Sequence, residues 1–163
     1  MPDLNPLEEK LAEVIGLAEA AEQATEKVGG MLDDDNDIAE LLKKLNEESK
    51  ETTERATKVA GEREGKKTAI LEMAAETKKE GVKMMGDYLD EDSDELDGFE
   101  FLIMTEAGEA GHWAILGKLN EKAGESAIGE LVEWALPVQE QHLSAVRDGS
   151  LELAAVEDPY ESD

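Results

Sequence analysis

Residues 99–116 read FEFLIMTEAGEAGHWAIL, an apolar helical stripe with two glutamates set into it. Phe99 and Trp113 lie on one face of a helix drawn through this stretch, and Glu106 and Glu109 fall on the same face. A carboxylate in an apolar core destabilises the fold unless it is paired or bound to a metal. The stretch therefore predicts a buried helix whose carboxylates need a partner.

Apolar residues at helical spacing predict four main helices along the chain. They cover residues 6–30, 38–60, 99–122 and 126–147. Asn5 and Pro6 favour the start of the first helix, because asparagine caps free N–H groups and proline fits the first turn. Gly124 is expected to end the third helix. Pro137 is expected to kink the fourth, since its ring removes one backbone hydrogen bond.

The connections between these helices predict an all-α, ferritin-like four-helix bundle. Helices 1 and 2 are joined by a short turn at residues 33–37, and helices 3 and 4 by another short loop. A long helical crossover, with a helix near residues 66–86, joins helix 2 to helix 3, which is the ferritin-like connectivity. We expect residues 1–147 to form this bundle, with an acidic linker at 87–98 and an acidic, flexible tail at 148–163.

Each predicted helix places at least one polar side chain on its buried face. The candidate metal ligands are Glu22, Glu48, Glu106, Glu109, Gln139 and His142. Gln139 and His142 have the three-residue spacing of the Glu-x-x-His element found in di-iron and di-manganese bundles. Carboxylates and a histidine on facing helices predict a carboxylate-bridged centre that holds two iron or manganese ions.

A metal-free interpretation stands beside the metal site. An isolated inward glutamate often extends its carboxylate to solvent, which applies to Glu22 and Glu48. Gln139 and His142 also fit a hydrogen-bonded pair inside an ordinary core. The two glutamates of the third helix are harder to explain without a ligand, because like charges in a core repel each other. The joint pattern on four helices favours the metal site.

The chain has only two histidines, and both fit a Glu-x-x-His type of spacing. His112 follows Glu109 by three residues, but the helical wheel places it at the edge of the buried face. His142 lies nearer the centre of its face. We favour His142 as the nitrogen ligand, although the spacing alone leaves both histidines open.

The charge of the chain limits its partners. It contains 42 acidic and 16 basic residues among 163, for a formal net charge of −26. Binding to nucleic acid or to an anionic membrane surface needs clustered Lys and Arg, so both are disfavoured. Because the acidic residues are spread over every exposed face, we interpret them as a halophilic adaptation to a high-salt cytoplasm. Capture of a cation or a basic partner is the functional alternative.

Cysteine is absent from the sequence, which excludes disulfides, zinc fingers and thiol catalysis. The opening residues MPDLNPLEEKLAEV lack a basic region and an apolar run, so we expect no signal peptide. No window approaches the roughly 20 apolar residues of a membrane span. We expect a cytoplasmic protein that forms a homodimer.

Several short segments together resemble one known family. They are residues 21–23 (AEQ), 47–48 (EE), 106–109 (EAGE) and 131–136 (LVEWAL). The third of these is similar to a Glu-His-Tyr-Glu element, and the last to the opening of a final helix. With these segments the chain resembles the YciE/YciF-like ferritin-like proteins over about residues 10–147.

The chain also departs from that family at two places. The family has a histidine in its second helix, where this chain has Ser49 or Lys50, and Pro137-Val138-Gln139 replaces carboxylates in the last helix. The resemblance implies a ferritin-like fold and a role in stress response. The first hypothesis is a metal centre that acts on O₂ or peroxide, with no catalytic residue assigned. The alternative is a metal-free structural or stress-response bundle with a degenerate site.

Overall fold

The chain folds into long helices throughout the part that the structure describes. The computed structural model describes residues 2–33 and 36–162. Its helices are α1 (Pro6–Gly29), α2 (Asp37–Gly61), α3 (Lys67–Tyr88), α4 (Glu95–Ala123) and α5 (Ser126–Ala155). The described residues contain no strand, which confirms the all-α class. Of the predicted turn, Asp34 and Asp35 lie outside the described residues.

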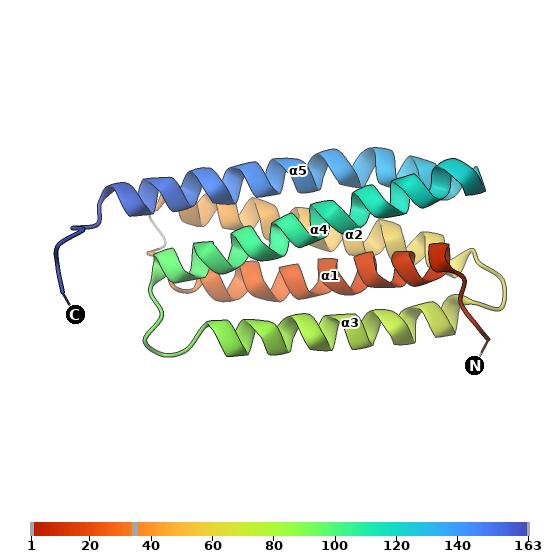
Figure 1. The fold of residues 1–163 in the computed structure, drawn as a ribbon, viewed down its shortest axis with the longest axis horizontal. Coiled ribbons are helices and arrows are strands. Elements are labelled where there is room, and N and C mark those ends of the chain that lie inside the picture. Colours follow the sequence, from red (N-terminus) through yellow and green to blue (C-terminus); the bar gives the residue numbers. More distant parts are fainter. Residues whose placement is uncertain (1, 34–35, 163) are drawn as a thin grey trace.

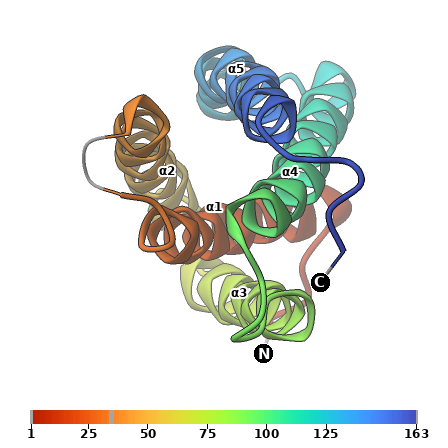
Figure 2. The same ribbon diagram turned by 90° about the vertical axis from the view of Figure 1, so that its left-hand side faces the viewer.

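The helices α1, α2, α4 and α5 surround a common interior, and α3 lies outside them (Figure 2). α1 packs against α2 and α4, and α5 packs against the same two helices, whereas α3 packs mainly on α1. Successive helices run in opposite directions (Figure 1), so α2 and α4 run the same way. The helix predicted near residues 66–86 is therefore present as α3, which connects these two parallel helices. Within the described ranges, no helix is long and apolar enough to cross a membrane.

Local capping interactions set several helix ends. The Asn5 side chain accepts a hydrogen bond from the Glu8 N–H at 2.9 Å, and the Glu8 carboxylate accepts one from the Asn5 N–H at 3.0 Å. The Asn36 side chain caps α2 by accepting from the Ile38 N–H. Gly124 follows α4 with φ +65°, a left-handed conformation that glycine adopts without strain. The predicted start at Asn5 and the predicted end at Gly124 are confirmed.

The predicted linker at residues 87–98 is too long. α3 continues to Tyr88, and α4 begins at Glu95. Asp94 and Asp97 form a reciprocal capping box in which each carboxylate accepts from the other residue's N–H at 2.9 Å. Acidic residues also stabilise the positive end of a helix dipole. The linker is therefore limited to residues 89–94, and the acidic residues at its end cap and begin α4.

The predicted end of the last helix at residue 147 is also wrong. α5 continues to Ala155, so residues 148–155 do not belong to a tail. Gly149 packs against the ring of Phe99 on α4, and a Cβ atom at Gly149 would lie 2.6 Å from Cε1 of that ring. The Ser150 hydroxyl donates to the Arg147 carbonyl at 2.6 Å. Because Gly149 has no side chain, α5 can pack closely on Phe99 beyond residue 147, where the composition had predicted a flexible tail.

A partly buried ion-pair network connects three segments at one end of the bundle. Arg63, just after α2, donates to the Glu8 carboxylate at 3.1 and 3.2 Å and also to the carboxylate of Glu125. Burial would raise the pKa of Glu8, but hydrogen bonds from the Asn5 N–H and from Arg63 hold that pKa below its ordinary value. The network joins the start of α1, the end of α2 and the loop before α5.

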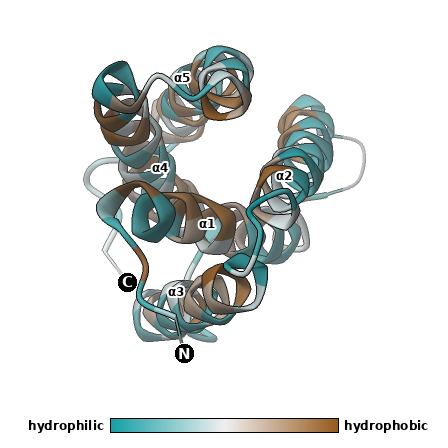
Figure 3. Cartoon of the chain, turned by 90° about the vertical axis from the view of Figure 1, so that its right-hand side faces the viewer, coloured by the Kyte–Doolittle hydropathy of each residue, from teal (hydrophilic) through white to brown (hydrophobic). Residues whose placement is uncertain are grey.

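The apolar core is divided into two parts along the length of the bundle. One part contains Leu11, Ile15, Ala56, Trp113, Leu116, Ile128 and Ala135. The other contains Ala24, Leu42, Leu45, Phe99, Leu102 and Val146. On each of the four central helices, about two to three turns separate the two parts. Outside this interval, the hydrophobic segments of the ribbon lie mainly where the helices face one another (Figure 3).

The contact between α1 and α3 depends on a missing side chain. A Cβ atom at Gly16 would lie 2.4 Å from the Ala74 carbonyl oxygen and 2.6 Å from the Thr77 Cβ. We expect Gly16→Ala to lower the free energy of unfolding by about 1–3 kcal/mol, the usual cost of overpacking. A urea denaturation series would measure it.

Gly111→Ala is the matched control for this change. Gly111 is exposed on α4, and a Cβ atom there meets no other atom within 4 Å. This change should be neutral or raise stability by up to about 1 kcal/mol, because alanine favours a helix over glycine. Equal stability of the two variants would show that α3 does not pack closely on Gly16.

Candidate metal centre

The interval between the two parts of the core is a polar layer. We define this polar layer as the buried or half-buried polar side chains Glu48, Ser49, Thr52, Glu106, Glu109, Gln139 and His142. α2 contributes the first three, α4 the two central glutamates, and α5 the last two. At this level α1 contributes the small buried residues Ala18 and Ala21. The polar layer therefore interrupts the apolar core on α2, α4 and α5.

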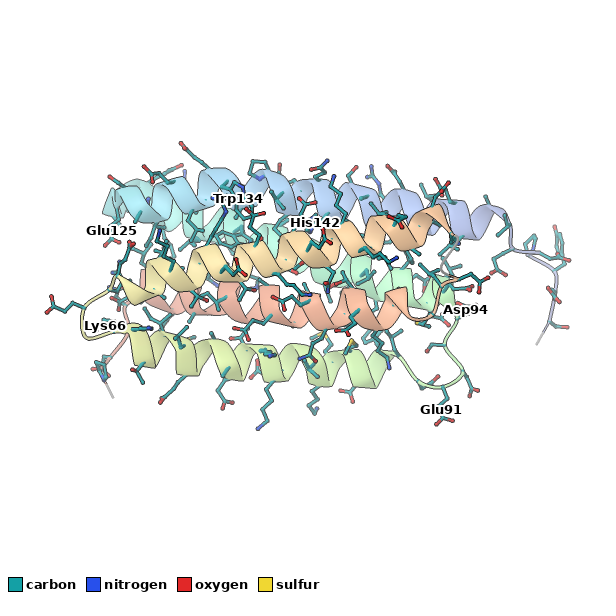
Figure 4. The ribbon with its side chains drawn as sticks, turned by 180° about the vertical axis from the view of Figure 1, so that it is seen from behind. Lys66, Glu91, Asp94, Glu125, Trp134 and His142 are labelled. Atoms are coloured by element: carbon teal, nitrogen blue, oxygen red, sulfur yellow. The ribbon has the colours of Figure 1, made fainter. Side chains whose placement is uncertain are left out.

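His142 lies between two carboxylates from two other helices. Its Nδ1 atom is 3.6 Å from Glu106 Oε2 on α4, and its Nε2 atom is 3.7 Å from Glu48 Oε1 on α2. The His142 side chain is 1 % exposed and that of Glu106 is fully buried. Figure 4 shows His142 on α5 alongside α2. These separations are too long for hydrogen bonds, so the three groups are neighbours without being directly bonded.

Glu109 adds a second buried carboxyl group close to the first. Burial and the charge of Glu106 together raise the pKa of Glu109 well above its ordinary value. Without a counter-charge, therefore, Glu109 holds its proton to higher pH than an exposed glutamate does. We call Glu48, Glu106, Glu109 and His142 the carboxylate–histidine cluster.

Unpaired polar atoms are concentrated at this level of the bundle. Among the residues that the structure describes, nine buried side-chain N and O atoms lack a hydrogen-bond partner. They belong to Glu106, Glu109, Trp113, Gln139 and His142. Buried polar atoms without a partner are rare in folded proteins because each costs about 1–3 kcal/mol. Their concentration in one layer indicates that the layer is completed by a group that the chain itself does not supply.

The structure brings together four of the six predicted ligands in this cluster, with Gln139 in the same polar layer and Glu22 outside it. Gln139 is fully buried on α5, one turn before His142, and neither its Oε1 nor its Nε2 atom is hydrogen-bonded within the described chain. Glu22 is half-buried on α1. Its carbonyl accepts from Asn46 Nδ2 at 2.8 Å, which sets Glu22 near the level of Glu48. The structure gives no contact between the Glu22 carboxylate and the carboxylate–histidine cluster.

The two histidines have different environments. His112 is 36 % exposed, and its Nδ1 atom lies 3.1 Å from both Glu13 Oε2 and Lys10 Nζ. Lys10 also pairs with Glu13 at 2.6 Å. His112 thus belongs to a half-exposed ion cluster between α1 and α4, whereas His142 lies in the buried polar layer.

Two features of the layer were missed by the sequence analysis. Trp113 follows Glu109 by one turn, and its buried Nε1–H is among the unpaired groups. The i, i+4 spacing of the two residues was visible in the sequence, but tryptophan was assigned to an ordinary core. Ser49 and Thr52 are buried too, although their hydroxyls donate to the carbonyls of Leu45 and Glu48 and need no ligand.

The side chains of the polar layer are of the types that bind metal ions, but their positions match those of a metal site only in part. Carboxylate oxygens with an imidazole nitrogen suit iron, manganese or zinc. Two ligands about 2.1 Å from one ion lie about 3–4 Å apart, close to the separations of His142 from Glu48 and Glu106. In the described residues, however, no three His, Asp or Glu side chains already converge on one metal-binding point. Binding would therefore require the glutamate side chains to change rotamer.

Comparisons with known proteins add nothing to the assignment of a metal centre, which rests on the geometry of the polar layer. No protein-family model matches the chain, and neither a curated protein nor a solved structure matches it.

Proposed function

We propose that the polar layer binds metal ions, with Glu48, Glu106, Glu109 and His142 as the main ligands. Gln139 of the same layer and Glu22 on α1 complete the set. Iron or manganese, bound as two ions, suits the mixture of four carboxylates and one imidazole. Such ions, when bound, supply Lewis-acid and redox chemistry toward O₂ or peroxide.

The observation that carries the proposal is the group of nine unpaired polar atoms in one layer. Neutral protein groups of this kind normally find hydrogen bonds inside the fold, and ionised ones find counter-charges. Here two carboxylates on α4 repel each other, and the nearest imidazole is too distant to bond with either. A cation between the carboxylates would satisfy the oxygens of Glu106 and Glu109 and one ring nitrogen of His142, whereas the N–H groups of Trp113 and Gln139 are donors and need an acceptor.

The arrangement of the helices supports a ferritin-like bundle as the scaffold. α1 with α2, and α4 with α5, form two antiparallel pairs, and α3 provides the long crossover between them (Figure 1). In di-iron bundles of this connectivity, ligands project inward from all four helices at mid-length. Glu22, Glu48, Glu106 and His142 stand on the four corresponding helices of this chain.

The rival function is a bundle that works without metal, in a structural or stress-related role. It is favoured by the lack of a converged ligand set among the described residues and by Ser49 or Lys50, one of which stands where the resemblance would require a histidine. In that case the polar layer would hold protons and water instead. The experiment below separates the two.

Anaerobic titration of chelator-treated protein with Fe(II), Mn(II) or Zn(II) tests the proposal. We expect saturable binding that quenches the fluorescence of Trp113, with Trp134→Phe used to remove the second tryptophan. Metal at 100 times its Kd should also stabilise the fold by about 2.7 kcal/mol, by mass action. If none of these ions binds or raises the melting temperature, the metal function is wrong and the rival stands.

A further inference from the structure

A second site lies on the other side of Glu109, between α1, α3 and α4. There the structure has a groove of about 640 Å³, a size typical of small-molecule sites. We call it the methionine groove, lined among others by Leu17, Met73, Met84, Phe101, Met104 and Glu109. Figure 2 shows α3 beside α1, outside the interior that α1, α2, α4 and α5 surround. The groove is thus separate from the polar layer except at Glu109.

The apolar lining of the groove is unusually accessible for so acidic a surface. Met84 is 46 % exposed and Met104 is 36 % exposed. Gly108 widens the groove on the α4 side, because a Cβ atom there would meet no other atom within 4 Å. Methionine side chains are flexible and polarisable, so they adapt to ligands of varied shape.

The charged residues of the groove select the sign of a ligand. Glu76, Glu80 and Glu109 line it together with Glu13, which is paired with Lys10 and His112, and apart from His112 none of its described lining residues can carry a positive charge. Glu109 is 1 % exposed, and both of its carboxylate oxygens lack a partner within the described chain. An anionic ligand would be repelled, whereas a cation would gain a buried acceptor at the inner wall.

We propose that the methionine groove binds a small organic cation with an apolar body, such as a primary alkylamine. The alkyl part packs on Met73, Met84 and Met104, and the ammonium group donates to Glu109. The proposal shares Glu109 with the metal centre but does not require a bound metal, since the groove is formed by α1, α3 and α4.

The experiment uses octylammonium with chelator-treated protein that carries ¹³C-methyl methionine. Spectra are recorded in about 1 M KCl, where the Debye length is about 3 Å and general attraction to the acidic surface is screened. We expect the methyl signals of Met73, Met84 and Met104 to shift on binding. Those of Met31 and Met85, which do not line the groove, should stay in place. Octanol should bind more weakly than octylammonium, and octanoate most weakly.

Variants test the location and the charge. Gly108→Phe should fill the groove and weaken octylammonium binding by at least tenfold, with Gly108→Leu as the smaller replacement if the first does not fold. Gly111→Phe places the same ring one turn away, on open surface, and should leave binding unchanged. Glu109→Gln should remove the preference for octylammonium over octanol.

Three outcomes would overturn the proposal. They are equal binding by Gly108→Phe and Gly111→Phe, shifts at Met31 and Met85 as large as those in the groove, or tighter binding of octanoate. A dimer that Gly108→Phe dissociates would assign the groove to a second copy of the chain instead. Because the protein is metal-free throughout, failure here leaves the metal centre untouched, and failure of the metal titration leaves the groove untouched.

Discussion

Replacing Glu106 and Glu109 together by glutamine is expected to abolish metal binding and to stabilise the metal-free bundle. Both carboxylates are at most 1 % exposed, and none of their oxygens is paired within the described chain. Losing a group that merely supports a ligand costs about 10–100-fold in affinity, so losing two ligands should cost more. Removing two repelling buried carboxylates should raise the unfolding free energy of the metal-free protein at neutral pH, by about 1 kcal/mol or more, because burial and mutual repulsion disfavour their ionised forms. Elemental analysis and urea denaturation measure the two effects.

The difference in unfolding free energy between the double variant and the wild type should depend on pH. The raised pKa of Glu109 sets the direction of this dependence. Burial and the neighbouring charge of Glu106 raise the pKa of Glu109 in the folded protein. The unfolded chain therefore loses this proton at lower pH than the folded chain, and folding favours the neutral acid. The resulting stability of metal-free protein is complete below the ordinary glutamate pKa, about 4.3, and is lost as pH rises through the folded pKa. The double variant should lack this dependence.

Glu130→Gln with Glu133→Gln is the matched control. These glutamates have the same three-residue spacing on α5, but both are exposed. The control removes the same net charge from the molecule without touching the polar layer. If it changes metal content or stability as much as the central pair does, the effects arise from total charge and the proposed centre is wrong.

Replacing His142 by alanine is expected to weaken metal binding by about tenfold or more, whereas replacing His112 should not. His142 is the nitrogen-bearing group between Glu48 and Glu106, at 3.7 and 3.6 Å. A histidine that binds a metal usually has its second ring nitrogen held by an acceptor. Glu48 and Glu106 lie on opposite sides of the ring, so one of them can bind the ion while the other orients the imidazole. Anaerobic Fe(II) and Mn(II) titrations of both variants measure the difference.

His112→Ala serves as the control within the same experiment. His112 interacts with Lys10 and Glu13 at the surface, so its loss should leave the affinity within about twofold of wild type, as is usual for substitutions outside special sites. If His112→Ala removes metal and His142→Ala does not, the ligand set has to be rebuilt around Glu109 and His112. Equal, large losses in both variants would indicate unfolding, which circular dichroism would reveal.

Much of the secondary structure was predictable from local patterns. Apolar spacing located the five helical segments, because a helix in contact with a core must repeat its apolar residues every three or four positions. Capping residues such as Asn5 and Gly124 gave correct ends for the same local reason. The errors arose where composition was read as flexibility. Asp94 and Asp97 cap a helix through their own hydrogen bonds, and Gly149 is held by a ring from another helix.

The candidate site divides in the same way. The sequence by itself determined that Glu106, Glu109, Gln139 and His142 are inward residues, because a helical wheel fixes the direction of each side chain about its own axis. It could not determine their height on neighbouring helices. Only the packing of α2 and α4 around α5 placed Glu48 and Glu106 on the two sides of His142, while Glu22 remained half-buried and His112 turned to the surface. That arrangement depends on the relative heights at which neighbouring helices pack. Contacts between side chains far apart in the sequence set these heights, so no local sequence pattern predicts them.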